Sequence, residues 1–384
     1  MYKRRSFVFG LGAVAGAGAC IITDKIKPLM ADMGQKIEAA RRDFTVVGEQ
    51  PLRERANAKG LIYGAASSYQ ELAKNSDFAK SFAEECGILV PVGEMKWKEQ
   101  RPSPKSFDFK QGDWLAKFAE DRGIKLRGHT LIWHQALPDW FEANVNKQNA
   151  EQVMLEHIAT VAGHYAGKMH SWDVVNEAIL PANGRSDGLR RTPWLEFLGP
   201  EYIDLAFQAA AQADPQALLV YNEQRLDYDT PEMEGRRVAV MKLLEGLKSR
   251  KTPVQALGIQ GHLFANEMRF NPKKLRQFLS DVAGLGLKIM ITELDVTDRR
   301  LPGDIAVRDR LVAGVYQDYL DVVLDEPAVI GVLNWGLSDR YTWIAGIRPR
   351  DDGMAVRPLP LDQDMKRKPA WQAIARSFDN TSSR

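Results

Sequence analysis

From residue 60 onward, short apolar runs alternate along the chain with longer segments that are apolar on one side only. Runs rich in β-branched residues and bounded by polar ones predict buried strands of a parallel sheet. The runs cover residues 61–64, 88–92, 125–133, 169–177, 217–222, 256–263, 288–296 and 329–335. The segments between them have apolar residues at helical spacing and predict amphipathic helices. They include residues 77–86, 151–165, 202–212, 236–248, 272–284 and 305–324.

This alternation of strands and helices predicts an α/β fold, a (β/α)8 barrel that forms a single catalytic domain over residues 51–384. The chain of 384 residues with 45% apolar content is long enough for such a barrel. An open doubly wound sheet is the structural alternative. That fold favours a glycine-rich phosphate turn after an early strand, and the sequence has none.

Polar and aromatic side chains collect where the predicted strands end. In a barrel of this kind, the carboxyl ends of the strands form the rim that carries the active site. Almost every run contributes at least one such residue, a distribution that core packing does not explain. These residues are Lys96, His129, Trp133, Asn176, Glu177, Tyr221, Asn222, Gln260, His262, Glu293, Asp295 and Trp335.

Two of these rim residues, Glu177 and Glu293, end apolar runs that are expected to lie across the barrel from each other. Two facing carboxyl groups meet the minimum requirement for hydrolysis of a glycosidic bond, one as acid and one as nucleophile or base. Strands six and seven are neighbours, so His262 is expected to hold Glu293 ionised and Asp295 to orient His262. A pair of structural rim salt bridges is the alternative interpretation of the glutamates.

The remaining composition argues against other functional classes. The formal net charge is +2, with no cluster of basic residues of the kind that binds nucleic acid. Metal-dependent hydrolysis is a rival because His129 and His134 resemble ligands, but their odd spacing on a strand directs them to opposite faces. We therefore expect no metal and no cofactor. A polysaccharide is the expected partner, and we expect a monomer.

The first residues have the pattern of an export signal. Lys3, Arg4 and Arg5 precede a short apolar stretch that ends in small residues, and the paired arginines indicate a twin-arginine-like signal over residues 1–24. An uncleaved anchor or a basic tail is the alternative. Cys20 after small residues leaves lipidation open. Residues 25–50 are predicted to form a tether, and the protein is expected in the periplasm or outside the cell, without a transmembrane span in the mature chain.

Six sequence blocks, in order, resemble glycoside hydrolase family 10, the endo-β-1,4-xylanase family of retaining (β/α)8 barrels. The resemblance extends from about Pro51 to Trp371. The blocks are Gly-Glu-Met-Lys-Trp (93–97), His-Thr-Leu-Ile-Trp-His (129–134), Trp-Asp-Val-Val-Asn-Glu (172–177), Gly-Ile-Gln-Gly-His-Leu (258–263), Ile-Thr-Glu-Leu-Asp-Val (291–296) and Asn-Trp-Gly-Leu-Ser-Asp-Arg-Tyr-Thr-Trp (334–343).

The resemblance implies roles for individual residues. Glu177 matches the acid/base of the family and Glu293 its nucleophile in a double-displacement cleavage of xylan. Tyr221 and Asn222 match the leaving-group side, and the family often has a cis peptide bond at the position of His129–Thr130. Other residues match positions around the sugar at the cleavage point, namely Lys96, His129, Trp133, Asn176, Gln260, His262, Trp335 and Trp343.

One pair of residues departs from the family pattern. Family members usually have Glu-Asn where this chain has Val92-Gly93, and those side chains hydrogen-bond the second sugar on the glycone side. Valine and glycine cannot make these bonds, whose loss costs about 1–3 kcal/mol of binding. Another β-glycan, such as a bacterial exopolysaccharide or a short aryl glycoside, is therefore the alternative substrate. A sugar-binding barrel without catalysis is a more remote alternative.

Overall fold

The computed structural model describes residues 42–384, and residues 44–384 form one compact unit. That unit begins a few residues before the domain boundary expected at residue 51. The export signal predicted for residues 1–24, Cys20 and most of the tether predicted for residues 25–50 lie outside the described residues. Among the described residues, no helix is both long and apolar enough to cross a membrane.

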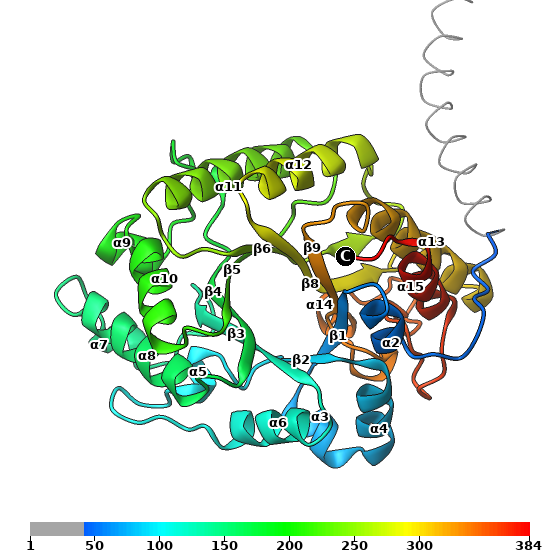
Figure 1. The fold of residues 1–384 in the computed structure, drawn as a ribbon, viewed down its shortest axis with the longest axis horizontal. Helices are drawn as coiled ribbons and strands as arrows, with labels where there is room; N and C mark the ends of the chain where they lie inside the picture. The colour runs from blue at the N-terminus through cyan, green and yellow to red at the C-terminus, as the bar shows by residue number, and fades with distance from the viewer. Residues whose placement is uncertain (1–41) are drawn as a thin grey trace, which may run out of the picture. The chain divides into compact units, whose positions relative to one another are not determined.

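A closed barrel of parallel strands occupies the centre of the unit, with helices around it (Figure 1). The strands run in chain order around the ring, and β1 closes it by pairing with β9. The described strands are β1 Ile62–Ser67, β2 Ile88–Pro91, β3 Lys125–Ile132, β4 Met169–Asn176, β5 Leu218–Glu223, β6 Ala256–Ile259, β7 His262–Phe264, β8 Lys288–Thr297 and β9 Val329–Asn334. The predicted (β/α)8 fold is confirmed.

The sixth predicted strand is interrupted and forms two short strands. Gly261 has a φ of +77°, a left-handed conformation that breaks the extended run between β6 and β7. Ile259 at the end of β6 pairs with Ile291, in the middle of β8. His262 at the start of β7 pairs with Asp295, nearer the end of that strand. The break therefore leaves His262 beside the last residues of β8.

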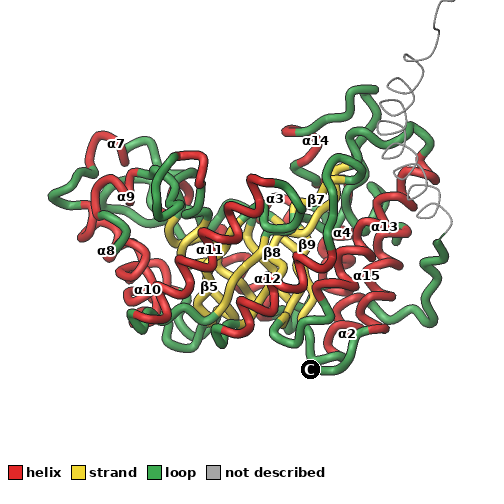
Figure 2. The backbone as a smooth tube through the Cα atoms, turned by 90° about the horizontal axis from the view of Figure 1, so that it is seen from above, coloured by secondary structure: helices red, strands yellow, loops and turns green. Residues whose placement is uncertain are grey.

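Helices follow most strands and cover the outside of the ring, as the view in Figure 2 shows. They begin with capping side chains where the sequence supplies them; Asn75, Thr230 and Asp304, for example, accept bonds from the first turns of α4, α11 and α13. The described helices are α2 Leu52–Asn57, α3 Tyr69–Lys74, α4 Ser76–Glu85, α5 Trp97–Gln100, α6 Lys110–Glu120, α7 Phe141–Asn144, α8 Ala150–His164, α9 Pro193–Leu198, α10 Tyr202–Ala213, α11 Pro231–Ser249, α12 Pro272–Gly284, α13 Ile305–Val323, α14 Ile344–Ile347 and α15 Pro369–Asn380, with 3-10 turns at Pro181–Asn183 and Asp339–Tyr341.

The inside of the barrel combines an apolar cluster with buried polar pairs. Ile88, Val90, Met290 and Leu333 are buried together from three different strands, and Trp335 packs against them while belonging to the rim. Arg127 is fully buried, where it forms an ion pair with Asp173. Such a buried charge requires its partner, so this pair fixes the β3–β4 contact.

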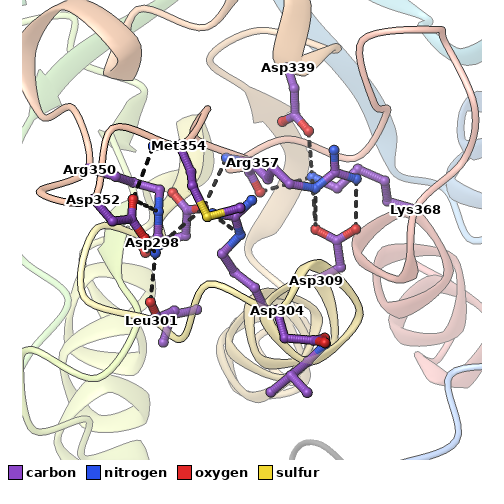
Figure 3. A network of polar contacts seen from close by, with 12 residues as sticks. Asp298, Leu301, Asp304, Asp309, Asp339, Arg350, Asp352, Met354, Arg357 and Lys368 are labelled. Atoms are coloured by element: carbon purple, nitrogen blue, oxygen red, sulfur yellow. Dashed lines mark hydrogen bonds and ion pairs between the residues drawn. The ribbon is translucent and has the colours of Figure 1, made fainter.

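A network of charged residues anchors the long segment between β9 and α15 (Figure 3). Arg357 forms two hydrogen bonds of 2.7 Å with Asp309 on α13. Lys368 donates to Asp339 at 2.8 Å, and both side chains are nearly inaccessible to solvent. Arg350 donates to the backbone carbonyl of Leu301 at 2.8 Å. The network therefore ties the segment that carries Trp343 to the end of β8 and to α13.

Candidate active site

Two buried glutamates stand at the carboxyl ends of β4 and β8. Glu177 follows directly after β4, and Glu293 lies within the last half of β8. They are 8% and 5% exposed, so both are largely shielded from solvent. Glu177 has a φ of +57°, in the left-handed region that non-glycine residues rarely adopt. Backbone strain of this kind concentrates at functional residues.

Glu293 is held in an ionised state by its neighbours. His262 contacts Glu293 Oε2 through Nε2 at 3.2 Å and Asp295 Oδ1 through Nδ1 at 3.0 Å. Burial lowers the pKa of His262, but Asp295 and Glu293 outweigh it and raise that pKa to about 10. Burial would also raise the pKa of Glu293, yet the bond from His262 and the nearby charges of His129, His262 and Lys96 lower it to about 2.

Glu177 is held by two amide side chains, one on each carboxylate oxygen. Gln260 Nε2 donates to Oε1 at 3.0 Å, and Gln224 Nε2 donates to Oε2 at 2.9 Å. Arg190 donates from Nε to the backbone carbonyl of Glu177 at 2.7 Å and reaches its Oε2 at 3.9 Å. These contacts fix the rotamer of the carboxyl group toward β6.

Shared partners join the two glutamates in one polar network. The backbone carbonyl of Gln260 accepts from the Glu293 amide at 2.8 Å, while its side chain binds Glu177 at 3.0 Å. Asn222 Nδ2 donates to Glu293 Oε1 and to Asn176 Oδ1, each at 2.9 Å, and its backbone carbonyl accepts from the Glu177 amide. The two carboxyl groups therefore belong to one site at one end of the barrel.

Lys96 faces this site from the N-terminus of α5. Its Nζ lies 5.0 Å from the centre of the Trp133 ring and 5.8 Å from that of Trp335. Burial lowers the pKa of Lys96, although the charges of Glu293, Glu177 and Glu94 act in the opposite direction. Lys96 therefore interacts electrostatically with both glutamates, which places it close to where a bound sugar would react.

The aromatic residues expected near the sugar divide into buried and exposed ones. Trp335 is 8% exposed, whereas Trp343 is 39% exposed at the mouth of the site. The Trp343 indole donates to Asp295 Oδ2 at 2.8 Å, and its ring centre lies 4.9 Å from that of His262. Trp343 is thus oriented by the same aspartate that orients His262.

His129 packs against Trp335 and is held by a buried aspartate. Its Nδ1 contacts Asp173 Oδ2 at 2.9 Å, and its ring meets the edge of Trp335 at 5.3 Å. Asp173 also accepts from Arg127, so a buried arginine sets the position of His129. The His129–Thr130 peptide bond is cis, as the family resemblance implied.

The structure does not bring every predicted residue to the surface of the site. Tyr221 is fully buried, and its hydroxyl donates to Glu223 instead of lining the cleft. Asn222 is also buried and contacts the other site residues rather than solvent. Val92 packs against the apolar cluster of the barrel. Gly93 has no heavy atom within 4 Å of the position that a Cβ would occupy, so open space remains there.

Four residues of the site were not identified from the sequence: Asp173, Arg190, Glu223 and Gln224. Asp173 was detectable as a charge inside an apolar run, four positions before Glu177. Glu223 and Gln224 directly follow Asn222, so the polar stretch that ends the fifth run extends two residues beyond the predicted site residues. Arg190 lies in a loop whose sequence has no periodicity, and no pattern indicated it.

The described residues contain no group of three or more His, Cys, Asp or Glu side chains arranged to hold a metal ion. What the site offers is one carboxylate stabilised in its charged form and a second carboxyl with amide donors, joined at the mouth of a barrel. This combination defines a class of enzyme: a glycosidase that uses two carboxyl groups.

Comparisons with known proteins agree with this class. The model for glycosyl hydrolase family 10 matches residues 51–377. A β-1,4-xylanase of Dictyoglomus thermophilum is 34% identical over 322 residues, which cover 81% of this chain and 87% of the relative. Endo-1,4-β-xylanase 1 of Humicola insolens is 36% identical over 332 residues, which cover 84% of this chain and 73% of the relative.

Solved structures give the same result. Native xylanase 10B of Thermotoga maritima has a TM-score of 0.78 and 31% identity, with coverage of 86% of this chain and 98% of the other. Xylanase 10B of Thermotoga petrophila RKU-1 in complex with xylobiose has a TM-score of 0.78 and 30% identity, with coverage of 87% and 99%. The chain is a glycoside hydrolase, and it belongs to glycosyl hydrolase family 10.

Proposed function

We propose that this protein cleaves internal β-1,4-xylosidic bonds of xylan with retention of configuration, with Glu177 as acid/base and Glu293 as nucleophile. The observation that carries the proposal is the single polar network in which Gln260 and Asn222 connect both carboxyl groups. The relatives named as xylanases support the choice of xylan.

The two steps follow from the environment of each glutamate. Glu293 is ionised and attacks the anomeric carbon, while Glu177 gives its proton to the departing glycosidic oxygen; an ester on Glu293 results. Glu177, now charged, removes a proton from water, and the hydroxide displaces Glu293 from the anomeric carbon. Retaining glycosidases of this type place their two carboxyl groups about 5–5.5 Å apart.

Several neighbours are suited to hold the sugar during these steps. Asn176 accepts a bond with its carbonyl oxygen, so its amide NH2 group remains able to donate to a sugar hydroxyl. Lys96 supplies further donors, and the exposed face of Trp343 offers an apolar surface against the sugar ring. Tyr221 is fully buried and donates to Glu223, so it supports the end of β5 instead of contacting the sugar.

A second candidate substrate rests on Val92-Gly93. Neither residue has a hydrogen-bonding side chain, and the space beside Gly93 is open. A glycone-side sugar with a different shape, or with an additional substituent, would fit there without losing contacts that this chain already lacks. A related β-glycan is therefore the alternative to plain xylan.

Product analysis on a small panel separates these possibilities. The panel contains xylan, mixed-linkage β-glucan and short aryl β-xylosides, and products are resolved by chromatography at equal enzyme concentration. We expect xylo-oligosaccharides of mixed length from xylan and much slower cleavage of the glucan. Release of products from the glucan or the short glycosides alone would contradict xylan as the substrate.

A further inference from the structure

Glu223 is a fully buried carboxylate that the reaction described above does not use. It is the last residue of β5 and is 0% exposed, and it follows Asn222 of the site. Burying a carboxyl group is costly unless it is paired or has a role. The hydrogen bonds of Glu223 show which segments of the site it holds in place.

Two of the hydrogen bonds to the Glu223 carboxylate come from residues that follow or hold Glu177. Oε2 accepts from the amide of Ile179, two residues after Glu177, at 2.9 Å, and also from the Tyr221 hydroxyl. Oε1 accepts from the amide of Gln224 at 3.0 Å, and the Gln224 side chain holds Glu177 Oε2 at 2.9 Å. Glu223 thus fixes both the chain after Glu177 and one of its two amide donors.

The backbone of Glu223 supports the other donor. Its carbonyl accepts from the amide of Gln260 at 3.0 Å, and the Gln260 side chain donates to Glu177 Oε1. Both amide groups that orient Glu177 are therefore positioned through the end of β5.

Charged and titratable groups face Glu223 from each element packed against it. Arg236 on α11 places Nη1 3.7 Å from Oε1, and the same nitrogen donates to the Ile179 carbonyl at 2.7 Å. Tyr202 on α10 and Tyr221 on β5 are the nearby phenols, and Glu177 is the nearby acid. Burial and then the charge of Glu177 raise the pKa of Glu223 to about 7, although the Tyr221 and Gln224 bonds and Arg236 act to lower it.

We propose that Glu223 is a positioning residue for Glu177, because its carboxylate fixes the segments that orient the carboxyl group of Glu177. The proposal rests on the acid/base role of Glu177 proposed above. The Glu223 carboxylate holds the amide of Ile179, two residues after Glu177, and the amide of Gln224, whose side chain donates to Glu177 Oε2. Loss of these bonds leaves the carboxyl group of Glu177 less well placed to give its proton to the departing oxygen.

The experiment compares kcat/KM of Glu223→Gln and wild type on two substrates. Phenyl β-xylobioside needs protonation of its leaving group, whereas the 2,4-dinitrophenyl glycoside needs little. A glutamine side chain has one acceptor oxygen instead of two, so it cannot hold the amides of both Ile179 and Gln224. For the phenyl substrate, we expect kcat/KM of E223Q to fall by about tenfold or more, because the acid is misplaced. For the dinitrophenyl substrate, kcat/KM should fall much less. Glu223→Asp keeps both acceptor oxygens and should bring kcat/KM on the phenyl substrate back toward wild type.

A second variant acts on the same segment. Arg236 donates to the Ile179 carbonyl and faces Glu223, so Arg236→Met loosens the chain after Glu177. Its kcat/KM should fall more on the phenyl substrate than on the dinitrophenyl substrate. If E223Q does not fold, this variant still tests the proposal. Asp214→Asn is the matched control, because Asp214 is a buried carboxylate before the start of β5 that contacts Trp172 and Gly167. The ratio of its kcat/KM values on the two substrates should equal that of wild type.

Glu177→Ala distinguishes failure of the acid/base role of Glu177 from failure of the positioning role of Glu223. If it loses kcat/KM on the phenyl substrate and keeps it on the dinitrophenyl substrate, the acid/base role holds. If kcat/KM of folded E223Q and R236M equals that of wild type on both substrates, the role of Glu223 alone is overturned. Equal losses on both substrates would do the same, since they indicate a purely structural role. A Glu177→Ala enzyme as active as wild type would overturn the proposed function itself.

Discussion

At the scale of single residues, the two glutamates differ because their partners differ. Glu293 faces an imidazole that is itself charged by Asp295, and it also feels Lys96. Glu177 instead accepts its side-chain hydrogen bonds from the neutral amides of Gln260 and Gln224, and the cation of Arg190 lies farther off, 3.9 Å from its Oε2. Nearby cations keep a carboxyl group ionised, as a nucleophile requires. Neutral donors leave a carboxyl group able both to give and to take a proton, as an acid/base requires.

Replacing His262 tests this difference. In His262→Ala, burial of Glu293 is no longer opposed by its main donor, so its pKa should rise from about 2 in the wild type. Because the proposed nucleophile Glu293 can attack only when it is ionised, the acidic limb of kcat/KM should move to higher pH by about two units or more. His164→Ala is a control, since this histidine pairs with Asp113 away from the site. An acidic limb that stays in place in H262A would contradict the assigned role of His262.

At the scale of elements, the position of Trp343 depends on the segment between β9 and α15. This segment crosses the rim without a long helix or strand of its own, and charged side chains hold it in place (Figure 3). Lys368 is the central cation: its Nζ donates to Asp339 and to the carbonyls of Arg357 and Leu359, each within 2.9 Å. Buried ion pairs of this kind specify one arrangement, since leaving a partner unpaired is costly.

Lys368→Met should therefore destabilise the fold by about 3–5 kcal/mol at neutral pH, as measured by urea unfolding. Burial raises the pKa of Asp339 to about 6 although Lys368 lowers it, so its protonated form is favoured in the folded state. The stability that Asp339 contributes is present at low pH and is lost as the pH rises through 6. Without Lys368 this loss is larger, so the destabilisation should be greatest above pH 6 and smaller below it.

Arg340→Met provides the matched comparison on the same segment. Arg340 and Asp364 form an exposed pair 4.0 Å apart, which should contribute no more than about 1 kcal/mol. Equal effects of the two substitutions, or a Lys368→Met effect that does not depend on pH, would contradict the importance of the buried pair.

At the scale of the whole molecule, the alternation of strands and helices was sufficient to predict the barrel. The rim residues were predicted because a barrel gathers strand ends at one face, so Glu177, Glu293 and His262 could be placed together without coordinates. The break at Gly261 was not predicted, because one glycine in an apolar run does not reveal a left-handed backbone. Arg190 was missed because a loop brings it to the site, and loops have no periodicity to interpret.

The residues that support the site were also difficult to predict from the sequence. Tyr221 was expected on the leaving-group side and Glu223 was not identified, whereas the structure shows that Tyr221 is buried and donates to Glu223. Side chains alternate along a strand, yet twist and the local turn at its end decide which of them reach the cleft. A sequence pattern therefore places residues at a rim more reliably than it separates substrate contacts from their supports.

The assignment of Glu177 and Glu293 is tested most directly by the anomeric configuration of the glycosyl azide that each alanine variant forms from an activated aryl β-xylobioside. In Glu293→Ala, azide takes the place of the lost nucleophile and attacks opposite the leaving group, so the α-azide is expected. In Glu177→Ala, the ester on Glu293 forms first and azide attacks it from the vacated side, so the β-azide is expected. Exchange of the two configurations between the variants, or turnover equal to wild type in either without azide, would contradict the account.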